Sequence, residues 1–250
     1  MTAAGISYRF DLGRVFTRTY NIIARNFMVL GALALLLYGL PRLGAEIADD
    51  ASGWMHGFPG FLFDWTDGIY GLIAAAGYFA LQASVVHGAV ADLNGYRATM
   101  PECLRTGVRS ILPVIGIFFV TVIAVALGLI ALIIPGLMIL TAWAIATPAA
   151  VIERIGVGDA FSRSAELTRG FRWHVLGLIA ILAVGLALVG GLVDGVEDSI
   201  HDALDFLPMS PPPLLEAIFD AAVALVACVA AVSLYVELRI VKEDATAEEF

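Results

Sequence analysis

The stretch that decides the fold is LIALIIPGLMIL, residues 129–140, which sets a Pro-Gly pair inside an apolar run that spans about residues 111–152. A bilayer core about 30 Å thick is crossed by about 20 apolar helical residues, so this run is about twice as long as one span requires. Proline inside a helix costs about 3 kcal/mol, and Pro-Gly is typical of a turn. The run therefore predicts two helices forming a hairpin with its tip at Pro135 and Gly136.

The composition extends this prediction to the whole chain. Hydrophobic residues make up 60% of the sequence and charged residues 15%, against about 25% charged residues in an average soluble domain. The apolar runs are continuous and lack the alternation of a β-barrel, so we expect an all-α integral membrane protein. The single membrane domain, residues 1–250, comprises a cytoplasmic amphipathic segment at 1–26, spans at about 27–43, 68–93, 111–132, 137–152, 173–193 and 214–238, and a cytoplasmic tail at 239–250.

The basic residues predict the orientation. All Lys and Arg except Arg42 fall before span 1, between spans 2 and 3, between spans 4 and 5, or after span 6. The positive-inside rule then places both termini in the cytoplasm. The net charge of −9 arises from acidic residues concentrated in the opposite loops, so it indicates no nucleic-acid partner. No short apolar core with a cleavage site begins the chain, and a removable signal peptide is not expected.

Three inner segments resemble one another. GRVFTRTYNIIARNFMVLG begins at Gly13 and GDAFSRSAELTRGFRWHVLG at Gly158, and both contain a Thr/Ser-Arg-Thr/Ser triplet centred on Arg18 or Arg163. GYRATMPECLRTGVRS, from Gly95, matches more weakly. A repeated segment is the mark of a repeated structural unit. We expect three units, each an amphipathic interfacial helix on the cytoplasmic side followed by a two-helix hairpin.

The order of motifs in the middle of the chain resembles a known family. The motif residues are Ile134, Pro135, Gly136, Trp143, Ala146, Pro148, Val151, Glu153, Asp159, Ala160, Arg163, Ser164, Leu167, Thr168 and Gly170. This order is similar to the multi-pass bacterial membrane family that includes the membrane domain of glycerophosphoryl diester phosphodiesterases. The resemblance implies a bacterial inner-membrane protein in which Pro135, Gly136, Glu153 and Gly170 are structural.

The same resemblance does not imply phosphodiesterase activity for this chain. In the fused relatives catalysis belongs to a separate soluble barrel domain, and the tail after Leu238, RIVKEDATAEEF, is too short for one. The sequence also contains no nucleophile and base pair and no glycine-rich phosphate loop. We therefore expect a protein that is not an enzyme and needs no cofactor.

The inner arginines are the first candidate binding groups, because guanidinium groups at this level meet the anionic headgroups of the cytoplasmic leaflet. The candidate lipid-headgroup residues are Arg14, Arg18, Arg25, Arg105, Arg109, Arg163, Arg169 and Arg172. We call these eight arginines the arginine belt. The acids Asp92 and Glu153 end spans 2 and 4, and each is expected to pair with an arginine of this belt and so to hold the surface helices against the bundle.

Charged or titratable groups at membrane depth give an alternative, an ion path. Glu216 and Asp220 share one face of span 6, and His87 lies in span 2. Each also has a structural interpretation: the two acids as an interfacial pair in contact with headgroup water, and His87 as a hydrogen-bonded packing group.

The remaining site alternatives involve metals and cysteines. Acids and a histidine recur at helical spacing in the third outer loop: Asp194, Asp198, His201, Asp202 and Asp205. They match no defined metal loop and are typical of a solvated helix, so no metal is expected. Cys103 and Cys228 are not expected to form a disulfide, because one lies on the inner side and the other inside span 6.

Two functions follow from these patterns. The first is a non-catalytic scaffold, or an accessory protein that interacts with anionic membrane lipids and with an unidentified membrane or cytoplasmic protein. The second is a transporter or channel for ions or small solutes that uses Asp220 and His87. Transporter sites usually combine broken helices with several convergent polar groups near the midplane, and this sequence offers few such groups.

Overall fold

The computed structural model describes residues 10–44, 61–204 and 214–243, and within them all regular structure is helical. Six helical stretches in these residues are long and apolar enough to cross a membrane, as the class of a multi-pass membrane protein requires. The elements are α1 (Leu12–Ala34), the π-helix η1 (Leu35–Gly39), α3 (Phe61–Leu93), α4 (Met100–Ala131), α5 (Ile133–Trp143), α6 (Ala146–Glu153), α7 (Val157–Thr168), α8 (Arg172–Leu204) and α9 (Leu214–Glu243).

The apolar run around the Pro-Gly pair forms two helices, but the turn lies earlier than predicted. The backbone leaves helical geometry at Leu132, with φ −165° and ψ 142°, and not at Pro135 and Gly136. Pro135 instead lies in the first turn of α5, where the missing N–H would have had no partner inside the helix. The placement of the tip at the Pro-Gly pair is therefore wrong by three residues.

Gly136 has a packing role in this pair of helices. A Cβ built on Gly136 would lie 2.5 Å from Leu129 Cγ, and one built on Gly128 would lie 2.8 Å from Gly136 Cα. The two glycines therefore let the backbones of α4 and α5 approach more closely than any side chain would permit.

The predicted fourth span is broken into α5 and α6 at Ala144 and Ile145. Side chains of α7 satisfy the backbone groups near this break. Ser164 Oγ donates to the Ala142 carbonyl over 2.7 Å and accepts from the Ile145 N–H over 3.3 Å. Thr168 Oγ1 lies 3.3 Å from the same carbonyl, although this hydroxyl has a single proton and is closer to the Ser164 carbonyl of its own helix, at 2.8 Å. Such compensation is what allows a helix to break inside a membrane protein.

Two of the three similar inner segments end in a break before the next long helix. In α1 the break is a kink at Asn26, with φ −116° and ψ 21°, and after α7 it is the turn at Gly170, whose φ is +91°. Gly170 suits this turn because a positive φ is strained for residues with a Cβ. The third segment has no such break, since α4 continues through Gly107 without interruption.

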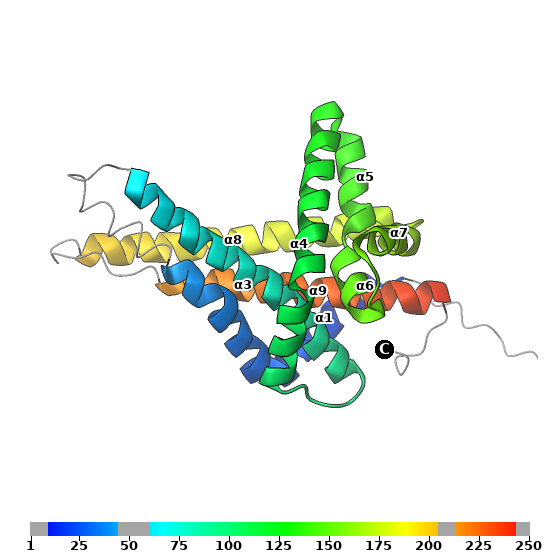
Figure 1. The fold of residues 1–250 in the computed structure, drawn as a ribbon, viewed down its shortest axis with the longest axis horizontal. Helices are drawn as coiled ribbons and strands as arrows, with labels where there is room; N and C mark the ends of the chain where they lie inside the picture. Colours follow the sequence, from blue (N-terminus) through cyan, green and yellow to red (C-terminus); the bar gives the residue numbers. More distant parts are fainter. Residues whose placement is uncertain (1–9, 45–60, 205–213, 244–250) are drawn as a thin grey trace, which may run out of the picture.

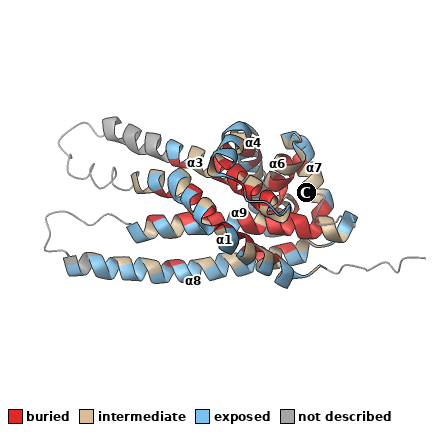
Figure 2. Cartoon of the chain, turned by 90° about the horizontal axis from the view of Figure 1, so that it is seen from below, coloured by how far each residue is buried: buried red, intermediate tan, exposed pale blue. Residues whose placement is uncertain are grey.

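The long helices do not share one direction. α8 and α9 run side by side, α1 and α3 cross them obliquely, and α4 and α5 project at a steep angle (Figure 1). The core lies between α1, α3 and α9, and the second half of α9 is buried almost throughout (Figure 2). Tyr235 and Val236 of α9, Leu30 of α1 and Val85 of α3 are completely buried there.

Large apolar side chains remain exposed on the helices outside this core. Ile130 and Ile134 are 82% and 70% exposed at the α4–α5 tip, and Leu188 and Leu192 on α8 are 69% and 71% exposed. Monomeric soluble proteins rarely expose contiguous apolar surface of this kind. In a bilayer these side chains would contact acyl chains.

Candidate functional site

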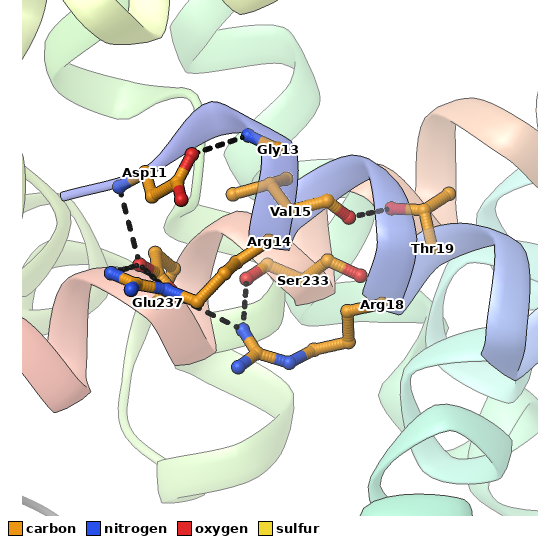
Figure 3. Close-up of polar contacts among 8 residues, drawn as sticks. All are labelled: Asp11, Gly13, Arg14, Val15, Arg18, Thr19, Ser233 and Glu237. Atoms are coloured by element: carbon orange, nitrogen blue, oxygen red, sulfur yellow. Dashed lines mark hydrogen bonds and ion pairs between the residues drawn. The ribbon is translucent and has the colours of Figure 1, made fainter.

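A buried carboxylate on α9 organises the first cluster of charged groups (Figure 3). Glu237 is completely buried, and its Oε1 accepts hydrogen bonds from Arg14 Nε at 2.9 Å and Arg14 Nη2 at 2.6 Å. Arg18 Nη1 lies 3.4 Å from the other oxygen, Oε2, and 3.2 Å from the Ser233 carbonyl. A buried carboxylate without partners is strongly unfavourable, so these two guanidinium groups compensate it and hold α1 against α9.

The start of α1 sets this geometry. Asp11 caps the helix by accepting from the Gly13 N–H at 2.8 Å, and its own N–H donates to Glu237 Oε1 at 3.4 Å. Arg14 and Arg18 are four residues apart and therefore lie on one face of the helix. Both arginines were predicted to bind lipid headgroups, and the structure places both beside an internal carboxylate.

The same face of α1 borders a polar cavity of about 520 Å³ next to the end of α3. Its charged lining residues are Asp11, Arg14, Arg18, Arg25 and Asp92, and Thr17 and Asn21 add further polar groups. Asp92 accepts from Asn26 Nδ2 at 2.8 Å and lies 3.8 Å from Arg25 Nη1, which is the ion pair expected for Asp92. Three guanidinium groups thus converge on one cavity, and Arg25 is the most exposed of them, at 64%.

A second cluster joins α6, α7 and α9. Arg163 Nε lies 2.8 Å from Glu153 Oε1, as expected for Glu153, and Arg163 Nη1 lies 2.5 Å from Glu243 Oε1. Tyr235 donates its hydroxyl to Glu153 at 2.6 Å, and Arg239 Nε pairs with Glu243 at 2.9 Å. Burial lowers the pKa of Arg163, but the hydrogen bonds to Glu243 and Glu153 outweigh it and raise that pKa overall. Arg163 of α7 thus forms ion pairs with α6 and α9 and holds the three helices together.

The other four predicted headgroup arginines have no ion pair among the residues that the structure describes. Arg105 and Arg109 on α4 and Arg169 after α7 are exposed. Arg172, at the start of α8, is partly buried, and its Nε is fully covered but has no hydrogen-bond partner. The predicted belt therefore divides into arginines that hold helices together and arginines directed toward their surroundings.

The three residues of the predicted ion path do not form one site. Arg42 Nε lies 3.2 Å from Asp220 Oδ2, and Arg42 Nη2 lies 3.6 Å from Glu216 Oε1. These acids belong to the first turns of α9, whereas His87 belongs to the last turns of α3, at the other end of the bundle (Figure 1). A cavity of about 290 Å³ between α3, α4, α5 and α9 is bordered by none of the three.

No group of three potential metal ligands occurs in the part of the chain that the structure describes. Asp205, one of the acids weighed as a metal ligand, lies outside the described residues. Cys103 and Cys228 are both buried and unbridged.

Sequence reasoning missed the residue at the centre of the first cluster. Glu237 lies one residue before the end of the predicted sixth span, where a charged side chain at membrane depth is itself a signal. It also missed the hydroxyl contacts of Ser164 and Thr168, because the break that they support leaves no mark of its own in the sequence.

The chain thus has the architecture of a multi-pass helical membrane protein, with charged clusters where α9 ends. No protein-family model, curated protein or solved structure matches it.

Proposed function

We propose that this chain is a non-catalytic protein of the bacterial inner membrane that binds anionic lipid headgroups at its cytoplasmic face. The observation that supports this most directly is the cavity beside α1, where Arg14, Arg18 and Arg25 converge. Guanidinium groups bind phosphate oxygens through paired N–H donors, and several on one wall favour an anion that a single arginine would hold weakly.

The buried Glu237 supports a binding role for these arginines as well as a structural one. It fixes Arg14 and Arg18 through some of their N–H groups, so little side-chain entropy is lost when a further anion is bound. Among the described residues, the Nε and Nη2 atoms of Arg18 have no partner, and a phosphate in the cavity would supply one.

The proposed location follows from the charges. The arginines of both clusters lie on the predicted cytoplasmic side, and an anionic leaflet provides the lipids that they would bind. The resemblance to the membrane domain of glycerophosphoryl diester phosphodiesterases supports the same bacterial membrane.

The proposed architecture is a set of hairpins with amphipathic interfacial helices, of which the first part of α1 and α7 are the two best candidates. Matched positions of their sequences have matched environments: Val15 and Ala160 are buried, as are Thr19 and Ser164. These pairs support an internal repeat.

The test compares lipids retained by native mass spectrometry after reconstitution in nanodiscs of phosphatidylglycerol and phosphatidylcholine. Arg25→Gln removes the most exposed cavity arginine and is expected to weaken phosphatidylglycerol retention about tenfold, the loss of one charge-assisted hydrogen bond. Arg97→Gln, at an exposed position that does not border the cavity, is the matched control and should retain the lipid. Equal retention of both lipids by wild type and by Arg25→Gln would exclude the proposal.

A further inference from the structure

A second lipid-facing feature lies where α5 passes the start of α8. A groove of about 150 Å³ there has an almost entirely apolar lining, made by Ile134, Leu137, Met138 and Leu176 together with Thr141, Arg172 and Trp173. It is separate from the cavity beside α1, with which it shares no residue.

The groove exists because α5 and α8 cross at a steep angle (Figure 1). Helices that cross steeply touch over a short length and then diverge, so side chains of the two helices cannot fill the space beside the contact. The atoms that line unfilled space lose dispersion contacts. In a bilayer, an acyl chain is available to fill this space and restore them.

Arg172 gives this groove a polar end. Its Nε is covered by protein and has no hydrogen-bond partner among the described residues, which leaves the positive charge of this guanidinium group incompletely compensated. The groove offers Arg172 no carboxylate, since every other lining residue is uncharged. Arg172 as a whole is only partly buried, so an anion from outside the described residues can approach the accessible part of its guanidinium group from the groove.

Trp173 indicates the level at which this anion lies. It is 83% exposed beside Arg172 in the first turn of α8. Tryptophan is enriched at the level of the headgroups, where its ring is partly in lipid and its N–H reaches polar groups. A phosphate at that level would be within reach of Arg172, and a chain descending from it would enter the groove.

We propose that the α5–α8 groove binds one anionic phospholipid, with its phosphate on Arg172 and one acyl chain between α5 and α8. This goes beyond headgroup binding at α1, because it adds a second lipid-binding site and requires that the lipid have an acyl chain. The chemistry is that of an amphiphile: inorganic phosphate lacks the apolar part, and a neutral lipid lacks the charge.

The experiment counts bound lipids on the full-length protein in phosphatidylglycerol nanodiscs, transferred to mild detergent for native mass spectrometry. Arg172→Gln removes the phosphate contact, and Met138→Trp fills the groove while leaving Arg172 in place. Met138 is half exposed, so this second variant keeps the test valid if Arg172→Gln fails to fold. Arg97→Gln, at an exposed position between α3 and α4 that does not border the groove, is the control.

Both groove variants are expected to lose one tightly retained phosphatidylglycerol, with about tenfold weaker retention, whereas Arg97→Gln keeps it. Adding 10 molar equivalents of free phosphatidylglycerol should displace the retained lipid more effectively than adding the same amount of inorganic phosphate. Retention unchanged in Met138→Trp, or a site that inorganic phosphate empties as readily as the lipid does, would overturn this assignment. If Arg25→Gln loses the retained phosphatidylglycerol and both groove variants keep it, the groove is excluded as a lipid site. The function proposed for the α1 cavity then still stands.

Discussion

At the scale of single residues, Glu237 has the largest expected effect on stability. In Glu237→Gln the carboxylate that compensates Arg14 and Arg18 disappears, and because these arginines are partly exposed the expected cost is about 2 to 3 kcal/mol. We expect a clearly lower thermal midpoint in detergent. Arg14→Gln should cost less only because Arg18 still compensates the buried carboxylate, over 3.4 Å. Equal midpoints for wild type and Glu237→Gln would contradict a structural role for the pair.

The variant Ser164→Ala tests whether this side chain of α7 stabilises the break between α5 and α6. Ser164→Ala removes the donor to the Ala142 carbonyl and leaves the Ile145 N–H without its partner, which is expected to cost about 1 to 3 kcal/mol. Thr168 replaces little of this bond, because its hydroxyl has a single proton and lies closer to the Ser164 carbonyl, at 2.8 Å, than to the Ala142 carbonyl, at 3.3 Å. Ser162→Ala, at an exposed position two residues earlier on α7, is the control, and both are compared by thermal unfolding in detergent. A control that loses as much stability as Ser164→Ala would show that the break does not depend on this hydroxyl.

At the scale of helices, the close contact of α4 and α5 makes Gly136 intolerant of a side chain. A Cβ at Gly136 would lie 2.5 Å from Leu129 Cγ and 2.7 Å from Leu129 N, so Gly136→Ala must push the two helices apart. We expect it to destabilise the protein by about 1 to 3 kcal/mol, the usual cost of overpacking. Gly185→Ala on α8, where a Cβ meets nothing within 4 Å, should be neutral or slightly stabilising. Denaturant unfolding of both variants in detergent gives the comparison.

The long helices were predictable because they depend on local sequence alone: about 20 apolar residues suffice to define each candidate span. The turn was misplaced because proline is tolerated in the first turn of a helix, so Pro135 is as compatible with following a turn as with forming one. The break at Ile145 and the partners of Glu237 depend on α7 and α1, which are distant in sequence. The steep angle of α4 and α5 was beyond reach for the same reason, since packing between helices determines it (Figure 1).

At the scale of the whole molecule, the separation of basic and acidic groups along the sequence predicts one orientation in the bilayer. The arginine clusters lie where α9 ends, and Arg42 is the only basic residue that the sequence places on the opposite side. Because positive residues are retained in the cytoplasm, the loop between α3 and α4 should face inward and the far end of α8 outward. Tyr96 and Ser199 are exposed at these two ends and are suitable labelling positions.

The orientation is measured with single cysteines in a chain whose buried Cys103 and Cys228 are replaced by alanine. A membrane-impermeant maleimide added to cells with a permeabilised outer membrane should label Ser199→Cys. It should label Tyr96→Cys only after the inner membrane is also opened. The reverse pattern would place the arginines of the α1 cavity outside the cell, away from the anionic cytoplasmic leaflet. Binding of its lipids through that cavity would then be excluded, whereas the packing of α1 against α9 would be unaffected, because Glu237 is an internal partner in either orientation.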